Sequence, residues 1–207
     1  MNLLRPTTKR ALVVYAHPDP ASFTAAARDR AIAALEGRGA EVEMIDLYAE
    51  GFDPSLTADE HRHHLDAERT ETSATGGPDS VMVRHGELLR WCDTLVIVYP
   101  TWWSAQPAIL KGWFDRVWTD GVAWDLPHGA NRIRPLLRNV RRIVVITAHG
   151  SGRLTNLVEG RVGKRTVGRG LRAMCHPLAR TQWRACYDMD RNSPAERERF
   201  LRRLDRL

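Results

Sequence analysis

The 207-residue chain is 43% hydrophobic and 27% charged, an ordinary globular composition that argues against intrinsic disorder. Its length suits one α/β domain over residues 1–207, and no apolar run approaches the roughly 20 residues of a membrane helix. Since the opening MNLLRPTTKR also has no apolar signal-peptide core, we expect a cytoplasmic protein without membrane insertion.

The net charge is +6, and 28 of the 31 basic residues are arginine, so a nucleic-acid partner has to be weighed. The basic excess lies mostly in residues 132–142 and 153–172, mixed with glycine and apolar residues, and no helix-turn-helix, zinc-finger or RNA-binding signature accompanies it. We therefore expect no nucleic-acid partner. Most of these arginines are predicted to be solvated, and an anionic small molecule such as a nucleotide phosphate is the alternative.

The amino-terminal part predicts a β-α-β unit. Residues 1–9 are expected to be flexible. The apolar run over 10–16 predicts a strand, the alanine-rich stretch over 23–38 a helix, and the loose alternation over 40–47 a second strand.

Residues 50–80 lose this periodicity and predict a long connection with one helical segment around 56–66. The sequence HRHH offers His61, His63 and His64 as metal ligands, but no second group of ligands accompanies them. We expect a solvated surface segment and no metal site. The three cysteines, Cys92, Cys175 and Cys186, form no CxxC pair, so they predict small residues in or near the core.

The middle of the chain predicts a helix from Asp79 or Ser80 to Cys92, followed by DTLVIVYP (93–100), a continuous apolar strand of the kind buried on both faces. A second helix is expected to begin near Pro107. Its apolar residues follow the spacing of one buried helix face, and they are Leu110, Trp113, Phe114, Val117 and Trp118.

The carboxyl-terminal part continues the alternation of strands and helices. RRIVVITAHG (141–150) predicts a buried strand and a glycine-containing loop, and a helix is expected over 164–174. ARTQWRACY (179–187) predicts a strand, and NSPAERERFLRRL (192–204) starts a helix. This order predicts a doubly wound α/β fold, a parallel sheet with helices on both faces.

In such a fold, ligands bind outside the carboxyl ends of the strands, which directs attention to residues 17–24, 100–104 and 147–152. The first loop lacks both GxGxxG and GxxxxGK[ST], which excludes two large classes of nucleotide enzyme. It carries His17, Ser22 and Thr24 at the start of a helix, where an anion is favoured, although Ser22 can equally be a plain helix cap.

The second loop carries Trp102 and Trp103 between the end of a strand and the start of a helix. Indole rings at the mouth of a crevice can stack on a planar heteroaromatic ligand. Trp113 and Trp118 belong instead to the apolar helix face and are predicted to be core residues.

Four segments in this order and spacing resemble the NAD(P)H:quinone oxidoreductase family: AHPDPASF (16–23), YPTWWSAQPAILKGWFDRVW (99–118), DGVAW (120–124) and TAHGSG (147–152). The resemblance covers about residues 10–190. It implies a flavodoxin-like five-stranded parallel sheet in the order 2-1-3-4-5. It also implies tightly bound FAD or FMN and a homodimer with active sites at the subunit interface.

The resemblance also implies roles for individual residues. The phosphate and ribityl chain of the flavin would be bound by His17, Ser22, Phe23 and Thr24. One side of its ring would be held by Pro100, Thr101, Trp102, Trp103 and Ser104. The other edge of the ring would be lined by Thr147, Ala148, His149 and Gly150. Trp124 matches an aromatic residue of the quinone and nicotinamide pocket. The family commonly has asparagine at the position of Thr24.

One departure concerns the charge on the reduced flavin. Thr155 and Arg161 stand where a tyrosine and a histidine are found in the family, so His149 and Arg161 are the candidate catalytic residues. The function implied is hydride transfer from NADPH or NADH to the flavin and then to a quinone-like acceptor, by a ping-pong scheme. The arginines of 153–172 are candidates for the NADPH 2′-phosphate.

Three alternatives are a non-catalytic flavin-binding regulatory subunit, a nitro or azo reductase for a dedicated metabolite, and a one-electron shuttle. The shuttle is disfavoured because such proteins are usually acidic and this chain is basic.

Overall fold

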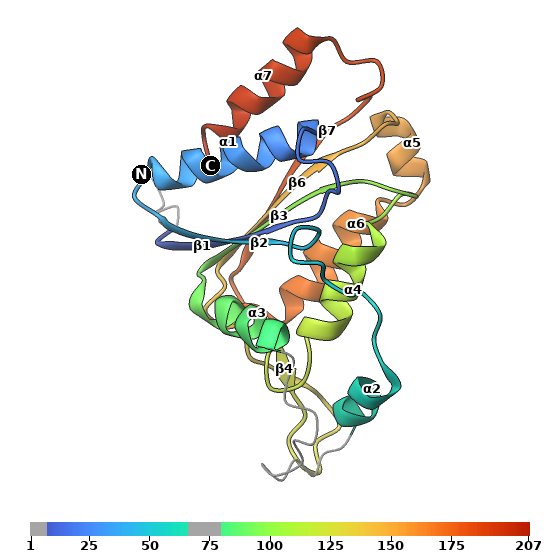
Figure 1. The fold of residues 1–207 in the computed structure, drawn as a ribbon. Helices are drawn as coiled ribbons and strands as arrows, with labels where there is room; N and C mark the ends of the chain where they lie inside the picture. Colours follow the sequence, from blue (N-terminus) through green and yellow to red (C-terminus); the bar gives the residue numbers. More distant parts are fainter. Residues whose placement is uncertain (1–7, 66–79) are drawn as a thin grey trace.

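The computed structural model describes residues 8–65 and 80–207 (Figure 1). Most of the segment expected to be flexible, residues 1–7, and the middle of the predicted long connection, residues 66–79, lie outside the described residues. Within the described ranges, no helix combines the length and the apolar character needed to cross a membrane.

The core of the fold is a five-stranded parallel sheet in the order β2-β1-β3-β6-β7. Its strands are β1 (Arg10–Tyr15), β2 (Glu41–Asp46), β3 (Thr94–Pro100), β6 (Arg142–Ala148) and β7 (Arg180–Cys186). Numbered as main strands, this is the expected order 2-1-3-4-5, so the predicted flavodoxin-like α/β fold is confirmed.

Helices cover both faces of the sheet because alternate strand residues point in opposite directions. Leu12, Leu95 and Ile143 lie in one buried cluster and Val13, Val144 in another. The first face carries α3 (Ser80–Trp91), α4 (Ala108–Val117), α6 (Val162–Arg165) and η1 (Thr166–Leu171), whereas α1 (Phe23–Glu36) and α7 (Pro194–Leu204) cover the second face (Figure 1).

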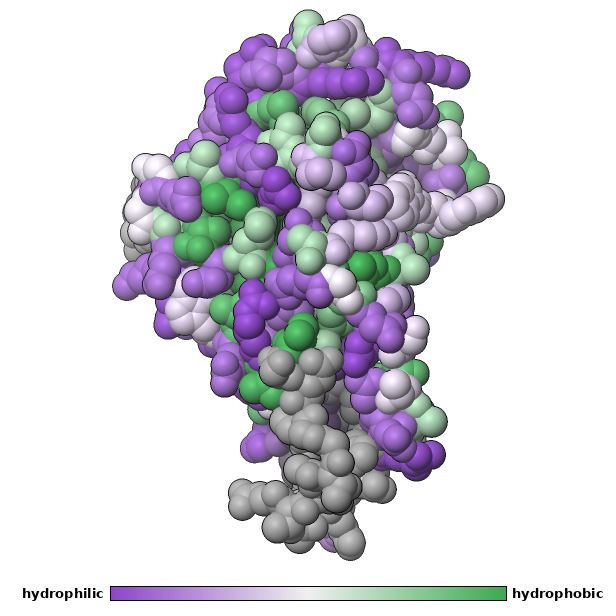
Figure 2. All heavy atoms as spheres, viewed as in Figure 1, coloured by the Kyte–Doolittle hydropathy of each residue, from purple (hydrophilic) through white to green (hydrophobic). Residues whose placement is uncertain are grey.

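The predicted helix starts have identifiable local causes. Pro107 is the N-cap of α4, and Ser193 forms a capping box with Glu196 at the start of α7. Trp113 and Trp118 of the predicted apolar face are buried, which confirms them as core residues. The surface over α7 is dominated by hydrophilic side chains, as expected for its arginine-rich sequence (Figure 2).

Some elements differ from the prediction. The expected helix over 164–174 is a short α-helix, α6, that continues as the π-helix η1. Helix α5 (Arg153–Val158) and the antiparallel pair β4 (Trp124–Asp125) and β5 (Arg134–Pro135) were not predicted, because elements of two to six residues are too short to show a periodic pattern. Helix α2 (Ala58–Leu65) lies in the predicted segment, and all three cysteines are buried.

Candidate functional site

The three predicted loops meet at the carboxyl edge of the sheet. Strand β2 pairs with one side of β1 and β3 with the other, so the strand order reverses between β1 and β3, where doubly wound folds bind ligands. The ring centroids of His17 and Trp102 are 6.2 Å apart, and the hydroxyl oxygens of Thr101 and Thr147 are 2.9 Å apart. The residues following β1, β3 and β6 therefore lie together at this edge of the sheet, and we call the place where they meet the crevice.

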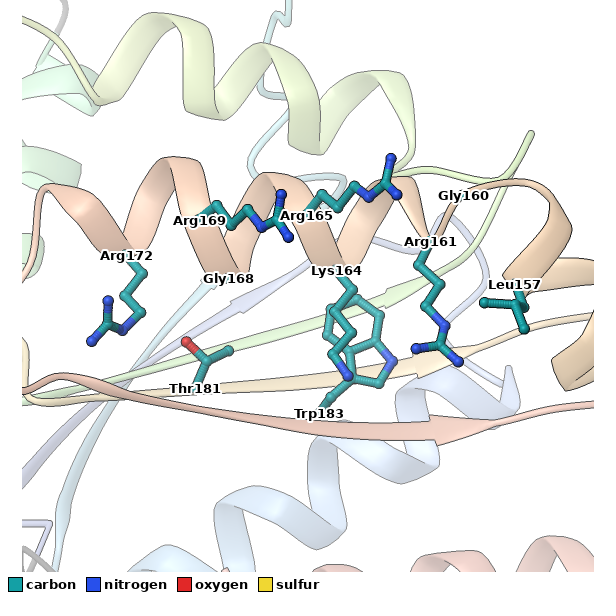
Figure 3. A pocket seen from close by; sticks show the side chains of 10 residues that line it. All are labelled: Leu157, Gly160, Arg161, Lys164, Arg165, Gly168, Arg169, Arg172, Thr181 and Trp183. Atoms are coloured by element: carbon teal, nitrogen blue, oxygen red, sulfur yellow. The ribbon is translucent and has the colours of Figure 1, made fainter.

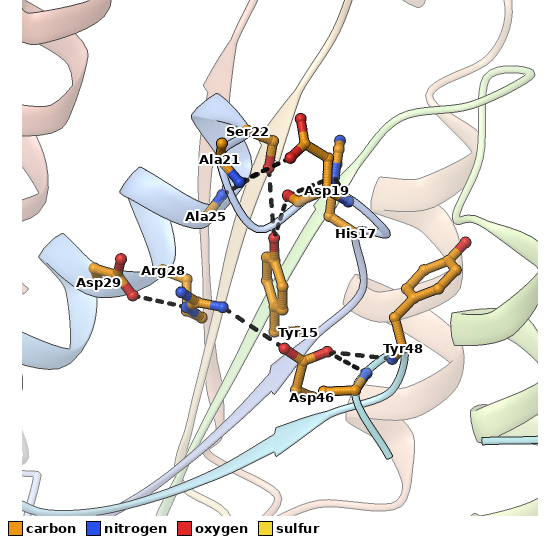
Figure 4. Close-up of polar contacts among 11 residues, drawn as sticks. Tyr15, His17, Asp19, Ala21, Ser22, Ala25, Arg28, Asp29, Asp46 and Tyr48 are labelled. Carbon is orange, nitrogen blue, oxygen red and sulfur yellow. Dashed lines mark hydrogen bonds and ion pairs between the residues drawn. The ribbon is translucent and has the colours of Figure 1, made fainter. Parts of the chain in front are cut away.

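The first loop is held by its own hydrogen bonds (Figure 4). Ser22 is the N-cap of α1, and its Oγ accepts the N–H of Ala25 at 3.1 Å. The Nδ1 atom of His17 accepts the N–H of Asp19 at 3.0 Å. The hydroxyls of Tyr15 and Ser22 lie 3.4 Å apart, so the loop is also tied to the end of β1.

The start of α1 offers backbone donors for an anion. The N–H groups of Phe23 and Thr24 lie in the first helical turn, where no intrahelical acceptor exists, and that turn carries no acidic residue. The Thr24 side chain is buried, and the Phe23 ring packs against Phe200 of α7 at 5.8 Å. Phe23 and Thr24 can therefore contribute their backbone to the crevice rather than their side chains.

The second loop contains a strained turn. Trp102 and Ala105 exchange backbone hydrogen bonds of 3.1 and 3.0 Å, and the two residues between them have positive φ, 47° for Trp103 and 65° for Ser104. These are the features of a type I′ turn, which normally uses asparagine and glycine. The turn leaves Trp102 41% exposed and Trp103 fully exposed. The sequence TWWS contains no signal for this turn. Backbone strain of this kind is typical of functional sites.

The third loop buries His149, which is only 3% exposed. Its ring stacks on Tyr187, with centroids 4.6 Å apart, and its Nε2 lies 3.3 Å from Thr101 Oγ1. Burial lowers the pKa of His149 to about 4, against a smaller opposing effect of the Glu159 charge. The imidazole is therefore neutral at neutral pH and approaches the crevice through the Thr101 hydroxyl.

The connection between β7 and α7 holds the third loop in place through backbone hydrogen bonds. The N–H of Met189 donates to the His149 carbonyl at 3.0 Å, and that of Asp188 donates to Ser151 at 3.1 Å. A Cβ atom on Gly150 would lie 2.8 Å from Asp190 Oδ2, so the Asp190 side chain packs directly over this glycine. These supporting residues of 187–190 carry no motif, and the sequence analysis did not identify them.

Two predicted site residues lie apart from the three loops. Arg161, with φ of 52°, is at the junction of α5 and α6 and lines a different cavity together with Trp183. Trp124 donates its Nε1–H to the Trp118 carbonyl at 3.0 Å, and its strand β4 lies beyond α3 and α4, away from the crevice edge (Figure 1). A single chain therefore does not bring either residue into the crevice.

Of the three histidines in the HRHH segment, the structure describes the side chain of His61 alone. His61 is exposed on α2, and the side chains of His63 and His64 lie outside the described residues. In the described part of the chain, no three histidine, cysteine or acidic residues are grouped as metal ligands would be.

The crevice has the groups needed for a ligand that combines a phosphate with a planar ring. Unpaired donors and the positive end of the α1 dipole favour the phosphate, and the half-exposed indole of Trp102 provides a face for the ring. This donor set fits a flavin nucleotide.

Comparison with solved structures shows the same architecture. An NAD(P)H:quinone oxidoreductase from Methanothermobacter marburgensis is 26% identical with a TM-score of 0.75, covering 96% of this chain and 94% of that one. An FMN-dependent NADH-azoreductase from Bacillus anthracis, in complex with FMN, is 16% identical with a TM-score of 0.76 and 96% coverage of both chains. The second likeness shows the fold alone.

The sequence comparisons agree. NAD(P)H dehydrogenase [quinone] 1 of Cavia porcellus is 33% identical over 159 residues, which are 72% of this chain and 56% of that protein. Ribosyldihydronicotinamide dehydrogenase [quinone] of Pongo abelii is 32% identical over 127 residues, 58% of this chain and 55% of that protein. The chain thus spans about half the length of these relatives. Residues 9–176 match the model of the flavodoxin-like fold, and the chain belongs to this family as a homologue of the NAD(P)H:quinone oxidoreductases.

Proposed function

We propose that the protein is a flavin-dependent NAD(P)H oxidoreductase that reduces quinones or similar planar acceptors by two electrons, in the cytoplasm. The observation that carries this proposal is the convergence of the α1 N-terminus with the strained Trp103–Ser104 turn at the point where the strand order reverses. The homology to NAD(P)H:quinone oxidoreductases supports it.

The cofactor proposed is FAD or FMN, which supplies a ring that accepts a hydride and passes it on. The backbone N–H groups of Phe23 and Thr24, with the Ser22 hydroxyl, would hold its phosphate. His17 would contact the ribityl chain beside them. The residues around the ring would be Pro100, Thr101, Trp102, Trp103 and Ser104 on one side and Thr147, Ala148, His149 and Gly150 on the other.

Donor and acceptor are proposed to use the same open face of the crevice in turn, which requires a ping-pong scheme. The exposed Trp103 would shield this face from water when a planar molecule lies over it. Because such a pocket selects flat shape more than particular substituents, quinones, nitroaromatic compounds and azo dyes are all acceptors to be tested.

We propose that His149 acts as a positioning residue. Its imidazole is neutral and contacts Thr101 Oγ1, so it would orient that hydroxyl toward the developing negative charge on the ring rather than supply a positive charge. His149→Ala should slow both reduction of the flavin by NADPH and its reoxidation by a quinone. Unchanged rates would remove His149 from the mechanism. Arg161 is the second candidate, and unchanged quinone turnover in Arg161→Ala would remove it.

A homodimer is proposed to complete the site. Helix α5 exposes apolar side chains near the crevice loops, among them Leu154 at 74% and Val158 at 81%, and a contiguous apolar surface of this kind favours a protein partner. In a dimer, Trp124 would reach the substrate pocket of the other copy.

The decisive experiment identifies the flavin released from purified protein and follows its anaerobic bleaching by NADPH and by NADH. The proposal expects rapid bleaching by at least one donor and recovery of the colour on adding a quinone. A colourless protein that takes up no added flavin contradicts it. A bound flavin that neither donor reduces favours the regulatory-subunit alternative.

The arginines of 153–172 lead us to propose a preference for NADPH. Steady-state rates with both donors test this, and equal kcat/KM values for NADH and NADPH contradict it.

A further inference from the structure

A basic groove lies between the α6–η1 helix and the edge strand β7 (Figure 3). Its volume is about 720 Å³, within the usual range of small-molecule sites. Among the residues that the structure describes, five cationic side chains and no acidic ones line it. We call the groove with these five residues, Arg161, Lys164, Arg165, Arg169 and Arg172, the basic furrow.

Within residues 8–65 and 80–207, no carboxylate balances the charges of the basic furrow. None of the five forms an ion pair with a carboxylate among the described residues. Only Arg172 donates side-chain hydrogen bonds, to the carbonyls of Ala179 and Pro177. Arg161, Arg165 and Arg169 are spaced by four residues, so like charges are neighbours along the helix and destabilise it. A bound anion would remove this repulsion.

The backbone of the furrow is unusual at the same place. Residues Thr166–Leu171 form a π-helix, a rare structure that is frequent at functional sites. Gly168 lies in it and lines the furrow, although nothing stands within 4 Å of where its Cβ would be. Glycine lowers helix stability and neighbouring atoms do not require it here. Its effect is to leave the wall of the furrow open.

Two side chains of β7 face this space. The Thr181 Oγ1 is buried and has no hydrogen-bond partner among the described residues. This hydroxyl can therefore form a hydrogen bond with a ligand in the furrow. Trp183 also lines the furrow, beside the Lys164 side chain (Figure 3). Its indole lies 3.5 Å from where a Cβ on Gly163 would be. Cations, a hydroxyl and an indole together can bind phosphates and stack a base.

We propose that the basic furrow binds a nucleotide carrying two or more phosphate groups, with the phosphates on Arg165, Arg169 and Arg172 and the base on Trp183. The cations extend from position 161 to 172, which in a helix spans about 16 Å, longer than one phosphate requires. A groove of this volume is the size of a small-molecule site, whereas duplex nucleic acid needs a larger surface. The furrow shares no residue with the three crevice loops, but it contains Arg161 and other arginines of 153–172 that the proposed function offers to NADPH. Binding of the donor in the furrow therefore rests on the proposed function, whereas binding of a separate nucleotide goes beyond it.

Calorimetric titration of the purified full chain with ATP as the probe tests the proposal. We expect binding of one ATP per chain, weaker at high salt, with inorganic pyrophosphate competing and adenosine alone binding far more weakly. No binding at millimolar ATP would overturn the proposal. So would binding of a single-stranded oligonucleotide by a protein that does not bind ATP.

Charge-matched variants locate the site. Arg165→Glu/Arg169→Glu should lower ATP affinity at least about 10-fold, because two charged hydrogen-bond donors are lost. Arg199→Glu/Arg206→Glu changes the net charge equally outside the furrow and should leave affinity within about 2-fold, allowing for long-range screening. Equal losses in both variants would overturn the assignment.

Gly168→Ala provides a second, gentler variant if the double variant does not fold. Its methyl group meets no protein atom but enters the furrow, so the variant should be at least as stable as the wild type and bind ATP more weakly. Unchanged ATP affinity in this variant and in a folded Arg169→Gln variant would contradict the proposal.

The same phosphate chemistry belongs to NADPH and to a separate nucleotide effector, and competition distinguishes them. If the furrow holds the donor, ATP raises the KM for NADPH and the furrow variants do the same. If it holds an effector, ATP binds without changing that KM. Both outcomes support a nucleotide site. A flavin-free protein that binds ATP would contradict the proposed function and leave this site intact.

Discussion

At the scale of single residues, His149 makes the stability of the folded chain depend on pH. Its pKa, lowered to about 4 by burial, lies below the value of about 6.5 for an exposed imidazole. As the pH falls below about 6.5, the unfolded chain takes up a proton that the folded chain excludes. The contribution of His149 to the free energy of unfolding is therefore fully present above about pH 6.5 and is lost as the pH falls toward 4.

We predict that the free energy of unfolding drops by about 2 kcal/mol from this residue between pH 7 and pH 4, after discounting for solvent screening. His149→Phe keeps a ring to stack on Tyr187 but cannot titrate, so its stability should change less over this range. Urea unfolding of both proteins at the two pH values measures the difference. Parallel pH dependences would show that His149 is not the group responsible.

The Trp103–Ser104 turn is a second feature of single residues. A non-glycine residue in the left-handed region costs about 1 kcal/mol, and Ser104 has φ of 65°. Ser104→Gly should raise the free energy of unfolding by about 0.5–1 kcal/mol. Ser151→Gly is the control, because Ser151 has no positive φ and the change should give no gain. Thermal unfolding of both variants checks this, and equal shifts would argue against strain in the turn.

At the scale of elements, helix α4 is positioned by contact with the chain that follows β2. A Cβ atom on Gly112 would overlap the backbone of Pro54, so the helix and this segment can approach only because residue 112 has no side chain. The contact holds the helix whose N-terminus follows the Trp102–Ala105 turn, and so it supports the crevice from outside.

Gly112→Ala should lower the free energy of unfolding by about 2 kcal/mol through overpacking, although alanine favours helices. Gly170→Ala is the matched control, since open space surrounds that position and the change should be neutral or stabilising. Chemical denaturation measures both. A stabilised Gly112→Ala variant would mean that the segment around Pro54 moves aside without cost.

At the scale of the whole molecule, the exposed apolar side chains of α5 bear on assembly. We predict a dimer in sedimentation equilibrium, and we expect Leu154→Glu to produce monomers because a charge at a buried interface is costly. Met44→Glu, on the exposed edge strand β2, is the control and should remain dimeric. If Leu154→Glu sediments like the wild type, α5 is not in the interface.

The doubly wound sheet was predictable because its strands carry strong local signals. The apolar runs around Val13, Val96 and Val144 are buried on both faces. A strand of this kind is continuously apolar in sequence, so it can be identified without knowledge of the tertiary structure. The loops that follow these strands could be predicted to meet, because parallel strands end at the same edge. The division of the tryptophans followed from helical spacing, which separates Trp113 and Trp118 from Trp102 and Trp103.

The conformations within the site were decided by tertiary structure. The type I′ turn at Trp103 and Ser104 runs against local preference and is held in place by the surrounding fold, so no local pattern indicates it. The neutral state of His149 depends on burial beneath Tyr187, a residue 38 positions later in the chain. Likewise, the arginines of 153–172 looked like solvated charge in the sequence. Only the packing of α6 and η1 beside β7 gathers them into a furrow, because charge density depends on distance in space and not along the chain.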